Sequence, residues 1–270
     1  MLTFTTLASS STGNCSLVSC GDTHILLDAG ISAKQIAAGL QSLGIAPHQL
    51  SAILITHEHS DHVSGLRVLS KKAGAPIYAT PFTCQAWYRK NRVDEVRALM
   101  REQEAGTGVQ IGSLWVESFP TPHDAACSVG YSIAGDGGRM VLCTDLGHVT
   151  REVRQAVEGC DLLVCETNHD EDWVRTGPYP YHLKQRILGN FGHLSNEAGA
   201  ELAAFAVETG AKTVVLAHLS QQNNTPAHAY ETVALRLLAM DCDPERDIKL
   251  SVAPKAEMGP TYRLEGVGVC

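Results

Sequence analysis

The chain has 270 residues, of which 44% are hydrophobic, and this is enough for a sizeable core. It contains no apolar run of about eighteen residues, so we expect no membrane span. Its first residues lack the basic segment of a signal peptide. The formal net charge of −8 argues against a broad basic face for nucleic acid, although bound cations can supply positive charge locally.

The nine cysteines are odd in number and include no C-x-x-C pair. Five of them lie in or beside apolar, strand-like runs: Cys15, Cys20, Cys143, Cys160 and Cys165. We therefore expect buried, reduced thiols in a cytoplasmic protein, and neither a disulfide framework nor a structural zinc finger.

The first part of the chain predicts three short strands, at 4–7, 16–18 and 25–27, and an amphipathic helix at 32–43. The loop between the first two strands contains Ser9, Ser10, Ser11, Thr12, Gly13 and Asn14. It is either an ordinary polar turn or a loop of hydroxyl and N–H groups that faces an anionic substrate. Asp28, after the third strand, is either an acid that orients metal-binding histidines or a helix cap.

Four side chains that can bind metal follow the apolar run 52–55, which predicts a buried strand. They are His57, His59, Asp61 and His62, and helical spacing resumes at 64–72. His57 and His59 are two residues apart and can bind one cation, while Asp61 and His62 can face a neighbouring site. Imidazole and carboxylate ligands suit zinc, manganese or iron. The alternative is a polar loop that is merely rich in histidine.

Three more candidate ligands follow later predicted strands. Strands are expected at 77–79, 114–119, 128–133, 140–143, 161–165, 213–216 and, last in the chain, 249–252. His123, Asp145 and His218 each lie just beyond one of them, and a carboxylate placed like Asp145 can bridge two cations. Helices are expected from 81 and at 149–157, 182–188, 197–207 and 230–239, and the charged stretch 89–104 is expected to be exposed.

The segment 57–62 matches a His-x-His-x-Asp-His signature, and most of the chain resembles the metallo-β-lactamase superfamily. This resemblance implies an α/β fold, the four-layer αββα sandwich, as one domain over residues 1–270. It also implies two divalent metal ions (Zn, Mn or Fe), with a hydroxide between them as nucleophile and Asp61 as its base. The implied ligands are His57, His59 and His123 for the first metal, Asp61, His62 and His218 for the second, and Asp145 as the bridge.

A second set of residues favours the phosphodiesterase branches of this superfamily. Glu166 follows a strand and His193 precedes a helix, and in those branches such a pair assists the leaving oxygen. A helix cap is the alternative role for His193. True metallo-β-lactamases generally lack an aspartate at the bridging position, so Asp145 argues against antibiotic hydrolysis as the main activity.

The chain is most similar to the YycJ/WalJ-like exonuclease subgroup, through the stretches 9–14, 56–62, 166–170, 177–182 and 193–197. The resemblance implies a 5′→3′ DNA exonuclease linked to mismatch repair, with a homodimer and a DNA-repair protein as candidate partners. It also implies substrate contacts from Ser9, Ser10, Ser11, Thr12, Asn14, His169 and Ser195. Two alternatives stay open: a glyoxalase II-like thioester hydrolase that shares the ligand set, and a regulatory protein that binds metal without catalysis.

Overall fold

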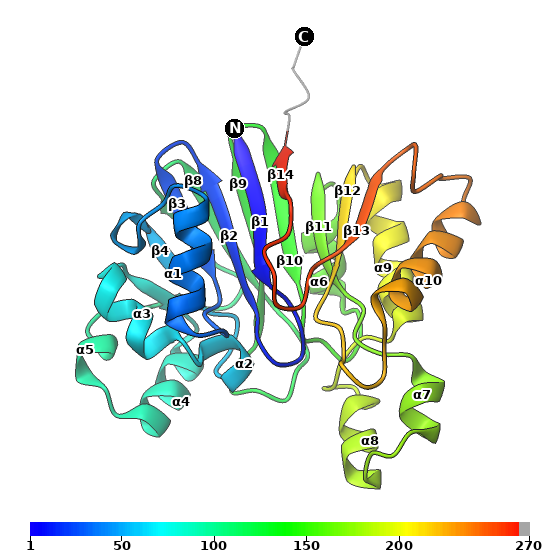
Figure 1. Cartoon of the computed structure of the whole chain (residues 1–270), viewed down its shortest axis with the longest axis horizontal. Coiled ribbons are helices and arrows are strands. Elements are labelled where there is room, and N and C mark those ends of the chain that lie inside the picture. The colour runs from blue at the N-terminus through cyan, green and yellow to red at the C-terminus, as the bar shows by residue number, and fades with distance from the viewer. Residues whose placement is uncertain (265–270) are drawn as a thin grey trace.

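The computed structural model describes residues 1–264, and two seven-stranded sheets pack face to face at its centre (Figure 1). The first sheet has the order β14 (Thr261–Leu264), β1 (Leu2–Ala8), β2 (Cys15–Cys20), β3 (Thr23–Leu27), β4 (Ala52–Leu54), β5 (Ile77–Ala79) and β6 (Met100–Glu102). The second has the order β13 (Lys249–Val252), β12 (Thr213–Ala217), β11 (Leu162–Glu166), β10 (Gly138–Cys143), β9 (Val129–Gly135), β8 (Leu114–Pro120) and β7 (Gly108–Ile111).

Helices cover the outer face of each sheet (Figure 1). The first sheet is covered by α1 (Ala33–Ser42), α3 (Leu66–Ala73), α4 (Pro81–Asn91) and α5 (Asp94–Arg97), with the short α2 (Ser60–Val63) and a 3₁₀ turn, Pro47–Gln49. The second is covered by α6 (Arg151–Val157), α9 (Asn196–Glu208) and α10 (Pro226–Leu238). The helices α7 (Glu171–Thr176) and α8 (Tyr181–Ile187) project beyond one edge of the sheets.

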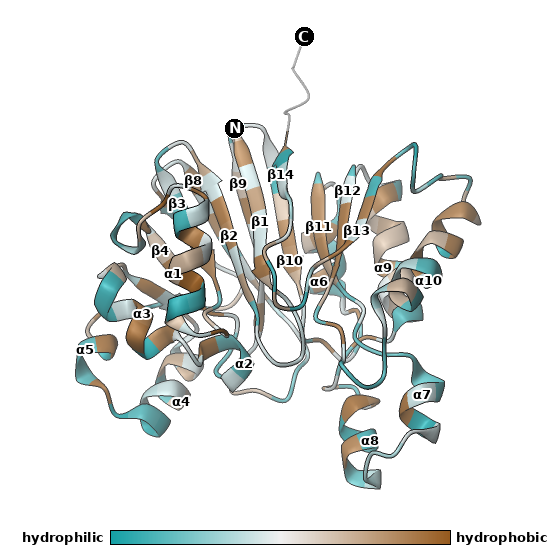
Figure 2. Cartoon of the chain, in the orientation of Figure 1, coloured by the Kyte–Doolittle hydropathy of each residue, from teal (hydrophilic) through white to brown (hydrophobic). Residues whose placement is uncertain are grey.

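Three separate apolar clusters hold these layers together. One lies between the sheets and includes Phe4, Tyr131 and Leu162, while the other two lie between each sheet and its helices. In Figure 2 the central strands are accordingly brown on much of their length, and the outer helices alternate brown and teal. Three buried clusters separating four layers confirm the predicted αββα sandwich.

The strands that precede the candidate ligands run in one direction. β3 and β4 are parallel in the first sheet, and β10, β11 and β12 are parallel in the second. β8 is antiparallel to β9, which is antiparallel to β10, so β8 has the direction of β10. The carboxyl ends of these strands therefore meet at one edge of the sandwich, where ligand sites of open α/β sheets are found.

The sequence-based elements are mostly confirmed, but several short ones were not predicted, among them the edge strand β7. Lys249–Val252 is not the final strand, because β14 pairs antiparallel with β1. The charged stretch 89–104 contains α5 and the edge strand β6, and α7 begins directly after Asp170. The elements α5, β6 and α7 are short and have one buried side chain or none, so they produce little hydrophobic periodicity.

The predictions about cysteines and about membrane spans can be compared with the structure of residues 1–264. The eight cysteines among residues 1–264 are all free thiols, as expected. No helix in the same range is long and apolar enough to cross a membrane. The prediction of one domain over residues 1–270 and that of a cytoplasmic location stay predictions.

Candidate metal and catalytic site

The seven predicted metal ligands converge at the shared edge of the two sheets. Their donor atoms form overlapping groups in which the atoms lie within 4.8 Å of one another. The groups are His57, His59 and His123; His57, His62 and Asp145; Asp61, His62 and His218; and Asp145, Glu166, His193 and His218. Side chains as far apart as residues 57 and 218 are therefore brought to one place by the fold.

Strand ends and tight turns aim these side chains across the edge. Asp28, Asp145 and His218 each follow a strand closely and have positive φ values of 58°, 61° and 57°. Such a conformation is uncommon for residues other than glycine and tends to occur at functional sites. Gly30 adds a close approach, because a Cβ there would lie 1.6 Å from the carbonyl oxygen of Asp61. The turn after β3 thus presses directly against the His57–His62 segment.

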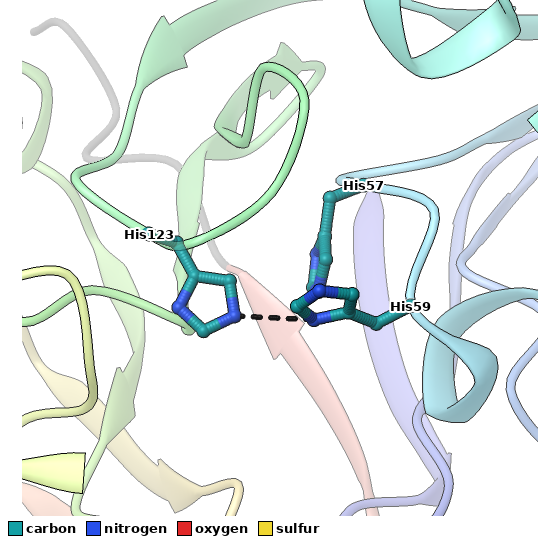
Figure 3. A group of neighbouring side chains, drawn as sticks. All are labelled: His57, His59 and His123. Carbon is teal, nitrogen blue, oxygen red and sulfur yellow. Dashed lines mark hydrogen bonds between the residues drawn. The ribbon is translucent and has the colours of Figure 1, made fainter. Parts of the chain in front are cut away.

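The first group consists of the His57, His59 and His123 rings, which face one another (Figure 3). His123 Nε2 lies 3.3 Å from His59 Nδ1, and His123 Nδ1 donates to the Gly192 carbonyl at 3.0 Å. The Nε2 atom of His57 is buried and has no hydrogen-bond partner. Burial, together with the neighbouring imidazole of His62, lowers the pKa of His57 well below its usual value, so it is neutral and can bind a cation.

The group of Asp61, His62 and His218 is supported by Asp28, a buried acid that is not itself a candidate ligand. Asp28 accepts hydrogen bonds from the Thr56 N–H at 2.9 Å and from the Thr56 hydroxyl. Its Oδ2 is 2.8 Å from His62 Nδ1, which leaves His62 Nε2 facing Asp61 Oδ2 at 3.3 Å. An outer carboxylate that fixes the tautomer of a histidine is the usual support of a metal-binding imidazole.

Asp145 lies between the His57, His59 and His123 group and the Asp61, His62 and His218 group. Its Oδ2 lies 3.3 Å from His62 Nε2, and its Oδ1 lies 3.3 Å from His218 Nε2 and 3.7 Å from His123 Nε2. Burial alone would raise the pKa of this carboxyl, but the surrounding imidazoles, His218 first, hold it well below its usual value. Asp145 Oδ2 is buried without a hydrogen bond, as is His57 Nε2. Unpaired buried acceptors of this kind are costly, and a divalent cation would satisfy them.

His193 and Glu166 form a tight pair beside this cluster. His193 Nδ1 donates to Glu166 Oε1 at 2.8 Å, and Glu166 Oε2 accepts the N–H groups of Leu146 and Leu194 at 3.0 and 3.2 Å. Glu166 is fully buried, whereas one-fifth of the His193 side chain is exposed. Burial lowers the pKa of His193, but the charge and hydrogen bond of Glu166 outweigh it and raise the pKa to about 9.

The predicted substrate loop divides into buried and exposed parts. Ser9 accepts the His218 N–H at 2.9 Å, Ser10 bonds to Thr12, and Asn14 Nδ2 lies 3.2 Å from His62 Nε2. Ser9, Ser10 and Asn14 are buried, whereas Ser11 and Thr12 are exposed and border a cavity of about 350 Å³ beside His193. The buried members position ligands, and the exposed members face the open side of the site.

Two further predicted substrate residues lie elsewhere. Ser195 is the N-cap of α9, where its hydroxyl accepts the Ala198 N–H at 3.2 Å. His169 is 1% exposed, and its Nδ1 lies 3.3 Å from Asn168 Oδ1. The structure does not bring either side chain to the 350 Å³ cavity.

Other residues also border this cavity, and sequence reasoning missed two of them, Arg186 and Gln221. Arg186, on α8, forms a bidentate pair with Asp124, the residue after His123. Gln221 Nε2 donates to the Thr12 hydroxyl at 2.6 Å across 209 residues of chain. Tyr179 lines the same cavity. The position of Asp124 directly after His123 was the one signal for it in the sequence. No local pattern predicts that Arg186 or Gln221 lies at the site.

The comparisons with known proteins agree with this geometry. A family model of the beta-lactamase superfamily domain matches residues 23–219. The exodeoxyribonuclease WalJ of Streptococcus pneumoniae is 38% identical over 248 residues, which are 92% of this chain and 92% of that protein. The exodeoxyribonuclease YycJ of Bacillus anthracis is 36% identical over 225 residues, 83% of this chain and 84% of that one.

A solved structure shows the same fold at low sequence identity. The metallo-beta-lactamase fold protein YhfI of Bacillus subtilis superposes with a TM-score of 0.71 and 14% identity, covering 97% of this chain and 100% of that one. The family model and the two relatives at 36–38% identity show that the chain belongs to the beta-lactamase superfamily. Its relatives WalJ and YycJ, both exodeoxyribonucleases by name, are similar to it over most of their length.

Proposed function

We propose that this chain is a metal-dependent exodeoxyribonuclease. The observation that supports it best is the His193–Glu166 pair, which lies at the edge of the His/Asp cluster where a leaving oxygen would need a proton. The names of two relatives at 36–38% identity support the same activity. A 5′→3′ polarity rests on the resemblance alone, and dimerisation and a DNA-repair partner stay predictions.

We assign the two groups of ligands to two divalent cations, of Zn, Mn or Fe. His57, His59 and His123 would hold one, and Asp61, His62 and His218 the other, with Asp145 shared. Bound there, the cations would activate a water at neutral pH and offset the negative charge that develops on the phosphate. Two buried atoms without hydrogen bonds fit this assignment, namely His57 Nε2 and Asp145 Oδ2.

Two side chains of the protein, Asp61 and His193, would accept and donate the protons of the reaction. Asp61 is partly exposed and its carboxylate can accept the proton of the attacking water, while its Oδ2 stays near His62. His193 is fixed through Nδ1 by Glu166, so Nε2 is the nitrogen left to protonate the leaving oxygen. Cations nearby would oppose the carboxylates that raise the pKa of His193, Glu166 first and then Asp145 and Asp61, and would so favour release of its proton.

The cavity beside His193 would receive the terminal nucleotide. Ser11 and Thr12 offer hydroxyl groups, Arg186 offers a guanidinium next to Asp124, and Tyr179 offers a ring. Hydroxyl and guanidinium groups bind phosphate oxygens, and an aromatic ring can stack on a base. We therefore expect these residues to affect KM for DNA more than they affect metal binding.

A paired assay separates this function from the glyoxalase II-like alternative, which would use the same ligands. The metal-loaded protein is given bis-p-nitrophenyl phosphate and S-lactoylglutathione in parallel, with zinc or manganese added. We expect hydrolysis of the phosphodiester at a rate well above that of the thioester. Preferential hydrolysis of S-lactoylglutathione would contradict the proposal, and no hydrolysis of either by a protein with two bound metals would support a non-catalytic role.

A further inference from the structure

A cluster of positive charge occupies one side of this acidic chain. Between residues 67 and 101 there are eight basic side chains and two acidic ones, Asp94 and Glu95, which leaves six net positive charges in a chain of net charge −8. The eight are Arg67, Lys71, Lys72, Arg89, Lys90, Arg92, Arg97 and Arg101. We call the surface they form, on α3, α4, α5 and β6, the basic face.

The basic face is exposed and electrostatically unpaired. All eight side chains are exposed, and none forms a salt bridge with an acidic side chain within residues 1–264. Elsewhere Arg175, Arg186 and Arg236 do pair with carboxylates. Protein surfaces usually intersperse the two signs of charge, so an unbalanced positive region attracts a polyanion.

A groove of about 530 Å³ runs through the basic face. It is lined by Phe82, Tyr88, Met100, the two arginines Arg97 and Arg101, and one acidic residue, Glu102, among others. The Phe82 side chain is 62% exposed, and the Arg97 guanidinium lies 4.5 Å from the centre of the Tyr88 ring. An exposed aromatic ring beside arginines suits single-stranded nucleic acid, since a base can stack on the ring and the phosphates can bind the cations.

The helix α4, which bears part of the basic face, begins against the loop that follows His123. Thr80, the N-cap of α4, donates its hydroxyl to the Cys127 carbonyl at 3.0 Å, and Thr83 donates to the same oxygen at 3.2 Å. Cys127 lies in the loop that follows His123. Figure 1 shows α4 near the edge of the sandwich that bears α2, and Figure 2 shows teal stretches on α3, α4 and α5. A strand leaving the catalytic site can therefore pass onto this side of the molecule.

We propose that the basic face binds single-stranded DNA next to the site of cleavage, with phosphates along its arginines and one unpaired base in the groove at Phe82. This inference rests on the proposed nuclease function and adds the path of the substrate to it. It also corrects the expectation drawn from net charge, because the acidic residues are concentrated elsewhere and the whole-chain sum hides a local excess of positive charge.

The test compares two variants that lose the same charge. R92Q/R97Q/R101Q removes three of the eight positive charges of the basic face, whereas K212Q/K249Q/R263Q removes three exposed charges at the opposite end of the sheets. Binding of a fluorescent single-stranded oligonucleotide is measured by anisotropy over a range of salt. Each lost phosphate contact lowers the slope of log K against log salt by about 0.7 for a single strand, so we expect a decrease of about 2 in the first variant and little change in the control.

Two further variants examine charge and stacking separately. R92K/R97K/R101K keeps the charges and should bind nearly as the wild type does. Phe82→Ala should weaken binding of single-stranded DNA by about 5- to 150-fold and binding of a blunt duplex much less, as loss of one stacked base predicts. All variants should hydrolyse bis-p-nitrophenyl phosphate at the wild-type rate, because this small substrate does not reach the basic face.

The outcomes distinguish this inference from the function on which it rests. If the wild type degrades DNA but the two glutamine variants bind it equally well, the basic face is not the DNA path and the nuclease function stands. If Phe82→Ala weakens duplex and single-stranded binding equally, the groove does not receive an unpaired base. A wild type that hydrolyses bis-p-nitrophenyl phosphate and neither binds nor degrades DNA would overturn both.

Discussion

The His193 imidazole is fixed by Glu166, whose fully buried carboxylate accepts the His193 Nδ1–H at 2.8 Å. The other oxygen of Glu166 accepts the N–H of Leu146, the residue after Asp145. One carboxylate therefore positions both the candidate proton donor and the turn that presents the candidate bridging ligand. If the chain is a phosphodiesterase, substitutions of His193 and Glu166 should therefore change its rate on DNA.

His193→Ala should reduce kcat on linear DNA by a factor of about 10² to 10⁴, the usual cost of removing a positioned acid. It should reduce the rate on bis-p-nitrophenyl phosphate much less, because that leaving group needs no proton. Elemental analysis should find unchanged metal content. Equal losses on both substrates would indicate a disrupted site, and no loss on DNA would leave His193 without a catalytic role.

Glu166→Gln should act through His193. A glutamine oxygen can still accept the N–H groups of Leu146 and Leu194, but its amide then faces His193 Nδ1, which can no longer donate. We expect a loss of kcat on DNA, and the double variant with His193→Ala should be no slower than His193→Ala alone. Additive losses in this cycle would show that the two residues act independently. Circular dichroism provides the control for folding.

Asp145→Ala and His59→Ala should abolish hydrolysis and leave a folded chain. Both residues lie in loops beyond strand ends, so their loss removes metal ligands and little of the apolar core. The wild type should bind two metals per chain and should melt at a higher temperature with metal than after chelation, since a ligand that binds the folded state stabilises it. Near wild-type turnover by either variant at limiting metal would refute its assigned role.

Asp28→Asn should weaken metal binding by about 10- to 100-fold, the usual effect of losing a carboxylate that supports a metal-binding histidine. Asparagine tolerates the positive φ of 58° at this position, so the backbone should be retained. Competition with a chromophoric chelator gives the affinity directly. Unchanged affinity would assign Asp28 to holding the Thr56 backbone only, through the bond at 2.9 Å.

Local sequence predicted the parts of the site that lie within one loop. His57, His59, Asp61 and His62 are within six residues, and the strand before them has a clear apolar run. The assignment of His123, Asp145 and His218 needed the order of ligands in a known superfamily. Isolated polar residues after strands are common and have no chemistry of their own until the fold brings them together.

The contacts that complete the site were beyond sequence reasoning because they join distant segments. Ser9 accepts the His218 N–H across 209 residues, so a serine predicted to bind substrate also holds the backbone of a candidate ligand. Arg186 approaches Asp124 only because α8 projects beyond the sheet edge. The strand β14 was missed because it has only four residues and pairs with β1, at the other end of the chain.

The most direct test of the proposed function is degradation of DNA with and without free ends. The metal-loaded wild type is incubated with a linear single strand and with the same sequence as a closed circle, and His193→Ala serves as the control. We predict that the wild type releases mononucleotides from the linear strand, leaves the circle intact, and loses this activity when chelated. A protein with two bound metals that cuts the circle as fast as the linear strand, or cuts neither while it hydrolyses S-lactoylglutathione, would contradict an exodeoxyribonuclease.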